Sequence, residues 1–300
     1  MGQLNPDCLL TSYSGAAAFG RSQLAGEVSS RTSSLLRCVG TCFGGVELRG
    51  QAGVAKKLIL FILATFSVLP VLGANVVYAD NDFFVYSPHV VQGQREVEIR
   101  GFGYQDGRSD LNGAGGYNIS LAHAVTDWWK PEVYVGEFNR TPGGSVFSSG
   151  YEFENTMQLS APGECWADFG LLASYVDSTQ PGISSIAEFG PLLEKMSGHI
   201  DQRLNLIFTK QIGGGASSAI VFRSAYSINY NFHADMATYS PGLEAYYRPA
   251  DNAYQIGPIF SGELRTDGGN ELEYSIGEVF GINSGAPSRT LLARLGYDFF

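Results

Sequence analysis

The chain has 300 residues and a formal net charge of −10, and charged residues make up only 16% of it. Ordinary globular chains carry about 25%. Mean hydropathy is nevertheless −0.01, and only one stretch is long and apolar. Low charge without long apolar runs is typical of alternating β-strands, because each strand averages to neutral hydropathy. The acidic balance argues against nucleic acid as a partner, since nucleic acid requires basic patches.

Residues 1–55 are rich in Ser and Gly and lack hydrophobic periodicity. We therefore expect no structural domain there, and two interpretations stay open. The start of translation lies further along, near Val54, or the stretch is a disordered extension. The spacing of Cys38 and Cys42 is weak support for a metal site, because no partner ligands accompany it.

Residues 56–79 contain two lysines followed by an apolar core that Pro70 interrupts. This order, with small residues at its end, predicts a secretory signal peptide that is cleaved after Ala79 or Ala74. The alternative is a transmembrane anchor, since the length is marginal for a span. Pro70 and the lack of a basic flank after the stretch favour cleavage.

The remaining chain, residues 80–300, contains 26 acidic and 13 basic residues and one cysteine, Cys165. It therefore has no intramolecular disulfide. From Arg95 onward it reads as about a dozen strand segments of about 10 residues, a length that suits tilted membrane strands. In the first segment, Val97 and Ile99 point to one face, and the intervening charged residues point to the other. Only the segment at residues 132–138 is ambiguous in phase.

The connectors between these segments are of two kinds, and the two kinds alternate along the chain. Alternation of tight turns with looser loops is typical of a membrane barrel. The short connectors are residues 126–132, 160–164, 197–202 and 266–271, and the longer ones are 105–116, 139–150, 177–184, 211–218 and 281–288.

Aromatic residues gather near the ends of the segments, as they do in the girdles of membrane barrels. A soluble β-sandwich is the alternative, because alternation and aromatics occur there too. The aromatic residues concerned are Tyr117, Trp128, Trp129, Tyr151, Tyr175, Tyr230 and Tyr254.

The last segment, residues 290–300, alternates from Leu291 onward and ends on two phenylalanines. It resembles the closing strand of bacterial outer-membrane β-barrels, although the alternation here runs through Phe299, with Phe300 one place beyond it. The resemblance implies an all-β fold for residues 80–300, an antiparallel transmembrane β-barrel of about 12 strands, with 10–14 possible. It also implies that the terminal aromatic strand is read by the barrel-assembly machinery. The residues that would form this signal are Leu295, Tyr297, Phe299 and Phe300.

The polar face of such strands would line the lumen, and two interpretations of its charges stay open. Paired charges would hold a narrow interior together, or an acid-rich pore would favour cations and neutral polar solutes. Glu152, Glu154 and Asp168 form the densest acidic group and are expected to set much of the field. The main pore-lining candidates are Glu96, Glu98, Arg100, Glu152, Glu154, Asp168, Arg203, Arg223, Glu263, Arg265 and Arg294.

Catalytic patterns are weak in this sequence. No histidine lies in the His-x-Ser pattern of outer-membrane lipid hydrolases, and no cluster has zinc-ligand spacing. His233 and Asp235 form a two-apart pair of the kind that arises often by chance. We therefore expect no enzyme, no cofactor and no metal site. The histidines are His89, His123, His199 and His233.

Together these features predict a barrel in the outer membrane of a Gram-negative bacterium, exported through a cleaved signal peptide. Its expected function is passage or uptake of small polar or cationic solutes through an acidic lumen that also contains arginines. The expected partners are outer-membrane lipid and lipopolysaccharide, the barrel-assembly machinery and small solutes. The alternatives are an outer-membrane enzyme acting on lipid or peptide, and a structural or adhesive barrel with a plugged lumen.

Overall fold

The structure is a computed structural model that describes residues 83–266 and 269–300. The predictions for the extension at residues 1–55, the signal peptide at 56–79 and the cleavage site lie outside the described residues. Within the described ranges, no helix is long and apolar enough to cross a membrane.

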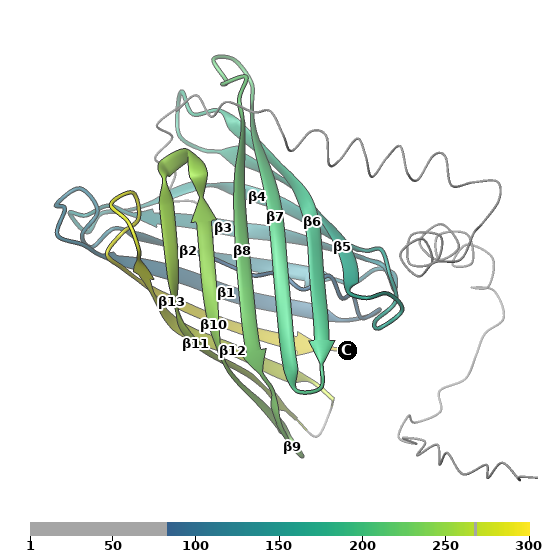
Figure 1. Cartoon of the computed structure of the whole chain (residues 1–300). Coiled ribbons are helices and arrows are strands. Elements are labelled where there is room, and N and C mark those ends of the chain that lie inside the picture. The colour runs from purple at the N-terminus through teal and green to yellow at the C-terminus, as the bar shows by residue number, and fades with distance from the viewer. Residues whose placement is uncertain (1–82, 267–268) are drawn as a thin grey trace, which may run out of the picture.

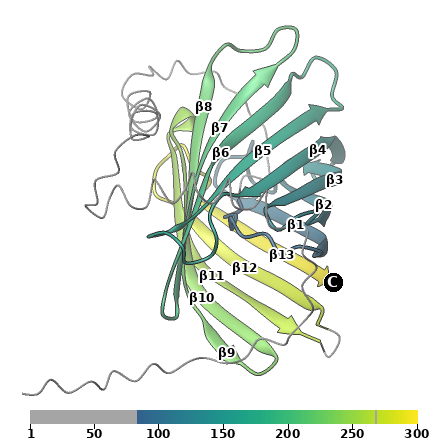
Figure 2. The same cartoon turned by 90° about the vertical axis from the view of Figure 1, so that its right-hand side faces the viewer.

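Twelve antiparallel strands close into a barrel (Figures 1 and 2). Closure comes from the first and last strands, because β1 (Arg95–Gln105) pairs with β13 (Arg289–Phe299) over its whole length. A short strand, β9 (Phe232–Ala234), pairs with β10 beside the ring. The predicted fold class and strand number are confirmed. The other strands are β2 (Gly115–His123), β3 (Trp129–Arg140), β4 (Val146–Gln158), β5 (Asp168–Ser178), β6 (Ser185–Ser197), β7 (Ile200–Ile212), β8 (Ile220–Tyr230), β10 (Ala237–Arg248), β11 (Ala253–Arg265) and β12 (Glu271–Gly281).

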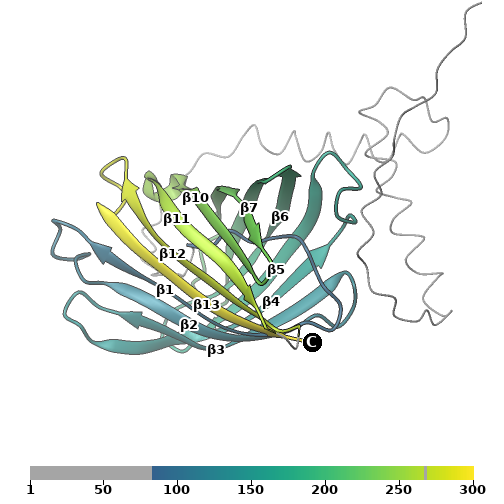
Figure 3. The same ribbon diagram turned by 90° about the horizontal axis from the view of Figure 1, so that it is seen from below.

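The strands place apolar residues outside and polar residues inside, as the period of two predicts. On β1, the side chains of Val97 and Ile99 are 41% and 44% exposed on the outer face, whereas Glu96 and Glu98 are 4% and 3% exposed on the inner face. Since the sheet curves into a ring (Figure 3), the outer positions of all strands form one continuous apolar surface.

The ambiguous phase of β3 has a structural cause. The register of β3 with β4 shifts between Tyr134 and Glu137, which marks a bulge. Tyr134 is buried inside and Val135 is exposed outside, yet Glu137 is buried and the Phe138 ring stacks on Tyr117. The bulge therefore shifts the alternation by one residue, and no single period of two fits the whole strand.

The two kinds of connector lie at opposite ends of the barrel. One end, here called the carboxyl-terminal end, holds the end of β13 and every connector predicted to be short; the other is here called the loop end. The predicted difference in connector length is small, however. The connector at residues 159–167, at the carboxyl-terminal end, is as long as the connector at residues 106–114, at the loop end. A 3-10 turn, η1 (Pro249–Asp251), joins β10 to β11 at the loop end.

Candidate functional site: the barrel lumen

The lumen contains a segment of the same chain, residues 83–94, which precedes β1. Phe83 contacts Phe102 near the loop end of β1, and the Gln94 side chain donates a hydrogen bond to Asp298 at the carboxyl-terminal end (2.8 Å). Residues 83–94 have no regular secondary structure, and Gln92 and Gly93 form a turn before β1. It therefore crosses the interior lengthwise, a placement that the sequence analysis did not predict.

At the loop end, the segment is held by aromatic contacts. The Phe83 ring centroid lies 5.3 Å from that of Phe102, 6.0 Å from Tyr104 and 5.2 Å from Tyr246. Tilted and edge-on pairs at these distances are the geometry that aromatic rings prefer. Phe83 is thus part of an apolar cluster that also contains Val85, Ala225, Val279 and Leu292.

In the middle of the lumen, an ion-pair network covers the inner faces of β1, β12 and β13. The Arg294 guanidinium contacts Glu96 (3.0 Å), Glu273 (2.9 Å) and Glu98. Arg100 adds a contact from its Nε to Glu98 of 2.7 Å. Such buried charges persist because each is paired within the barrel wall.

Phe84 lies against this network. Its ring centroid is 4.3 Å from the guanidinium carbon of Arg100 and 4.8 Å from that of Arg294. Cations at these distances from a ring are attracted by its π electrons. The segment therefore contacts the two arginines through a ring face, while the carboxylates of the wall neutralise their charge.

Tyr86 is fixed from two sides. Its backbone N–H donates to the Asn205 Oδ1 (2.6 Å), and the Asn205 Nδ2 donates to its carbonyl oxygen (3.0 Å). Its hydroxyl donates to Glu154 (2.8 Å). The ring also packs on an apolar patch of the inner wall, which comprises Leu172, Leu192 and Ile207, each 0% exposed.

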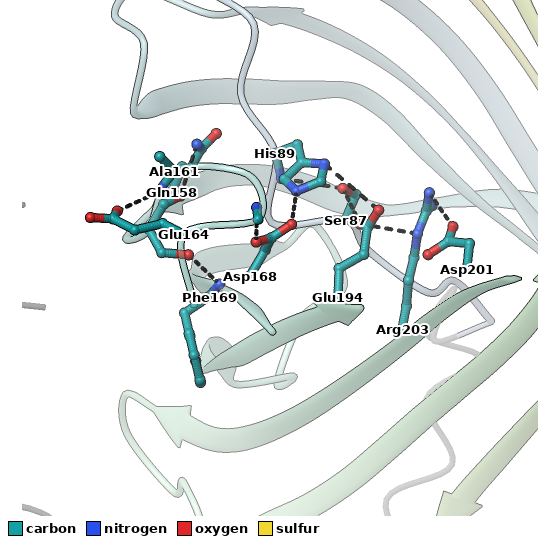
Figure 4. Close-up of polar contacts among 12 residues, drawn as sticks. Ser87, His89, Gln158, Ala161, Glu164, Asp168, Phe169, Glu194, Asp201 and Arg203 are labelled. Carbon is teal, nitrogen blue, oxygen red and sulfur yellow. Dashed lines mark hydrogen bonds and ion pairs between the residues drawn. The ribbon is translucent and has the colours of Figure 1, made fainter. Parts of the chain in front are cut away.

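The segment's last contacts before the turn into β1 are polar (Figure 4). The His89 Nε2 lies 2.9 Å from Asp168 and its Nδ1 lies 3.6 Å from Glu194. The Ser87 hydroxyl donates to Glu194 (2.6 Å), which also faces the Arg203 Nε (3.2 Å). Because the serine bonds a carboxylate and not the imidazole, these residues do not form an activated nucleophile.

Free space remains beside the segment. A cavity of about 470 Å³ reaches from the connector at residues 159–167 along the inner faces of β10–β12. A second cavity of about 70 Å³ continues beside Phe84 and shares Arg203, Ser275 and Arg294 with the first. The carboxylates that line the larger cavity are Asp168, Glu194, Asp201, Glu263 and Glu273.

Most of the predicted pore-lining residues lie inside the barrel. Arg265 differs, because its side chain is 55% exposed at the carboxyl-terminal rim, where it pairs with Glu271 (2.9 Å). Arg203, Glu263 and Arg294 line the larger cavity. Glu152 is half-buried, and the remaining predicted residues, Glu96, Glu98, Arg100, Glu154, Asp168 and Arg223, are buried.

The expected acidic group does not form one patch. Glu154 bonds Tyr86 in the middle of the lumen, whereas Asp168 bonds His89 at the carboxyl-terminal end. The two residues lie on neighbouring strands, but Glu154 is paired with Ser174, which lies further along β5 from Asp168. Their fields therefore act at different depths.

The terminal aromatic strand has the expected alternation. Leu295 and Tyr297 are exposed on the outer face, Phe299 is half-buried with its ring 6.2 Å from that of Tyr297, and Phe300 is exposed. Their role in assembly stays a prediction.

Sequence reasoning missed several interior residues. Lys130 pairs with Glu96 (3.1 Å), and Glu132, Glu137 and Asp201 are buried inside. A signal for the internal segment was present in the sequence, because Phe102, Tyr104, Leu172 and Leu192 occupy inward positions of their strands. Large apolar side chains facing a wet lumen would require a cover.

At the loop end, two loops are tied together. Arg108 donates to the carbonyl oxygens of Ser284 (2.8 Å) and Ala286 (2.7 Å), and the Ser288 backbone N–H donates to Asp106 (2.6 Å). Hydrogen bonds from Arg108 hold the pKa of the Asp106 carboxyl well below its usual range. Among the described residues, no group of three or more His, Cys, Asp or Glu side chains is arranged to hold a metal ion.

No model of a known protein family matches the chain, and no curated protein does. Among solved structures, the NanC porin is similar at 11% identity and a TM-score of 0.44, over 68% of this chain and 99% of that one. The translocator domain of the autotransporter NalP from Neisseria meningitidis is similar at 11% identity and a TM-score of 0.41, over 71% of this chain and 90% of that one. OmpT, an outer membrane protein of Vibrio cholerae, is similar at 8% identity and a TM-score of 0.29, over 75% of this chain and 99% of that one. The chain is a closed 12-stranded antiparallel barrel by its own strand pairing, and these three solved structures are bacterial outer-membrane β-barrels.

Proposed function

We propose that the chain is a barrel of the Gram-negative outer membrane through which small cations or neutral polar solutes pass. The observation that carries this proposal is the cavity of about 470 Å³, which continues past Phe84 as a narrower space. Its lining has five carboxylates against four cationic side chains, those of Lys195, Arg203, Arg265 and Arg294, so a small acidic excess remains. A low-dielectric wall focuses the field of such charges on a solute. The internal segment leaves room only for small solutes.

The outer face supports membrane insertion. Large apolar side chains on every barrel strand are exposed there, among them Val133, Phe153, Phe189, Leu243 and Ile276. A soluble monomer rarely exposes so continuous an apolar surface. Outer-membrane lipid and lipopolysaccharide are the proposed partners of this face, and residues 295–300 are the proposed signal for the barrel-assembly machinery. Export through a cleaved signal peptide at residues 56–79 is part of the same proposal.

The lumen supports a channel better than an enzyme. Ser87 donates to Glu194 while His89 faces two carboxylates, so this group lacks the serine–histidine contact that nucleophilic catalysis requires. His233, the histidine of the two-apart pair with Asp235, lies at the barrel rim, where its ring nitrogen is 3.3 Å from the Thr238 hydroxyl.

Conductance in planar bilayers tests the proposal. We expect single channels of low conductance whose reversal potential under a salt gradient indicates cation preference. A barrel that inserts and shows no conductance would instead favour the second candidate, a structural barrel with a plugged lumen. The contacts of residues 83–90 along the interior favour that candidate specifically.

A further inference from the structure

We infer that the inner wall of the barrel is a binding site for an extended aromatic peptide, and that residues 83–90 are its ligand, held in cis and able to leave. Peptide binding does not require the lumen to conduct, so it stands apart from the proposed channel function.

The wall presents two apolar surfaces that the segment covers. One lies at the loop end and receives Phe83 and Val85, and the other is the patch of Leu172, Leu192 and Ile207 beneath Tyr86. If the segment left without replacement, both surfaces would face water. Burial of apolar area therefore favours refilling of the site by a ligand with aromatic side chains at the same spacing.

The wall also recognises a peptide backbone. Asn205 donates to a carbonyl oxygen and accepts from an N–H of the same residue, Tyr86. The Gln158 Oε1 accepts from the backbone N–H of Val90 (2.7 Å). Amide side chains that bond the main chain in this way bind an extended peptide, while the apolar surfaces select its side chains.

One position on the wall is shaped to the segment. A Cβ atom built on Gly170 of β5 would lie 2.6 Å from the Pro88 Cβ and 3.0 Å from its Cα, and also 3.0 Å from the Met157 carbonyl oxygen of β4. A side chain at position 170 would therefore push the segment outward. Gly103 of β1 differs, because a Cβ there meets nothing within 4 Å.

The segment can leave without breaking the wall. It joins no strand before β1, and two of its charged neighbours, Arg294 and Glu194, keep partners in the barrel, whereas Glu154 loses the Tyr86 hydroxyl. Arg294 retains its carboxylates on β1 and β12, and Glu194 retains Arg203. Gly93, at φ +90°, forms the turn between the segment and β1. Among the described residues, the segment is thus joined to the barrel at its carboxyl end and otherwise held mostly through side chains.

Binding of a synthetic peptide of residues 83–91 tests the inference. A tethered segment acts as though present at about millimolar concentration, so a micromolar peptide does not displace it from the unmodified chain. In the full chain with Phe84→Ala and Tyr86→Ala, the resident segment is weakened and the wall is unchanged. We expect fluorescence anisotropy to show labelled peptide binding at least about tenfold tighter to this variant than to the unmodified chain.

Adding Gly170→Val to the weakened variant should abolish peptide binding, whereas adding Gly103→Val should leave it intact. A peptide with the same residues in scrambled order should not bind. Folding of the weakened variant is checked first, by the heat-dependent shift of its electrophoretic mobility. If the folded weakened variant does not bind the peptide, that result overturns the inference. Equal binding with Gly170→Val would do so as well, because the peptide would then be adsorbed elsewhere.

A trapping experiment covers the case in which the weakened variant does not fold. The full chain for this experiment carries Gly170→Cys and has its native cysteines, Cys8, Cys38, Cys42 and Cys165, replaced by Ser. The side chain at position 170 crowds Pro88 of the resident segment, and a covalent bond captures even a peptide that binds rarely. Under mild oxidation the peptide carrying Pro88→Cys should therefore form a mixed disulfide, and the same peptide with scrambled order should not. Failure to form it would contradict peptide exchange. Binding without conductance would sink the channel proposal alone, and conductance without binding would sink the inference alone.

Discussion

Asn205 forms two hydrogen bonds with the backbone of Tyr86, one to its N–H (2.6 Å) and one from its own amide to the carbonyl oxygen (3.0 Å). The two residues are 119 positions apart. Because the backbone of Tyr86 has no strand partner, Asn205 supplies what a neighbouring strand would. The side chain on β7 thereby fixes how deep the segment lies in the lumen.

Asn205→Ala should therefore lower the free energy of unfolding by about 1–3 kcal/mol, since it leaves a buried N–H and a buried carbonyl without partners. Asn229→Ala is the matched control, because Asn229 lines the open cavity on the adjacent strand. Denaturant unfolding of both variants in detergent measures the difference. Equal effects would show that the segment does not depend on Asn205.

Arg294→Gln should destabilise the barrel by about 3–5 kcal/mol, because it leaves Glu96, Glu98 and Glu273 without their shared cation. Arg265→Gln at the exposed rim should cost about 1 kcal/mol or less. The same unfolding measurement compares them. A smaller loss for Arg294→Gln than for Arg265→Gln would contradict the interior network.

Ile276→Arg should destabilise the membrane-inserted barrel by about 2–4 kcal/mol, because Ile276 is exposed at the middle of β12, where the bilayer is most apolar. Ile220→Arg, at the loop-end terminus of β8, should cost about 0–1 kcal/mol. Unfolding from lipid vesicles reports both. Equal tolerance would mean that this surface does not face lipid.

Glu263→Gln with Glu273→Gln should reduce cation over anion permeability, because both carboxylates line the cavity that remains beside the segment. Glu154→Gln should change it less, since Glu154 is covered by Tyr86. Reversal potentials under a salt gradient distinguish the variants. A larger shift for Glu154→Gln would place the ion path on the other side of the segment.

The outer face could be predicted from the sequence, because outer positions are apolar and inner positions are polar on strands that alternate cleanly, as at Val97 and Ile99. The bulge in β3 was hidden, since it depends on pairing with β4. The interior was predicted less well. Its charges could be assigned to a face, but a period of two does not reveal that Glu154 and Asp168 lie at different depths. The segment at residues 83–90 lacks periodicity and gives no signal of its own. The only sign of it was the presence of large apolar side chains, such as Leu172 and Phe102, at inward positions of the strands.

The placement of residues 83–90 inside the barrel is tested most directly by a disulfide between Pro88→Cys and Gly170→Cys in the chain whose native cysteines, Cys8, Cys38, Cys42 and Cys165, are replaced by Ser. The two Cβ positions lie 2.6 Å apart, so an outward shift of about 1 Å brings them to disulfide geometry. Mild oxidation of the folded barrel in its membrane should cross-link most molecules, while Pro88→Cys paired with Gly103→Cys should stay reduced. Equal thiol reactivity in the two pairs, with no cross-link in either, would contradict it.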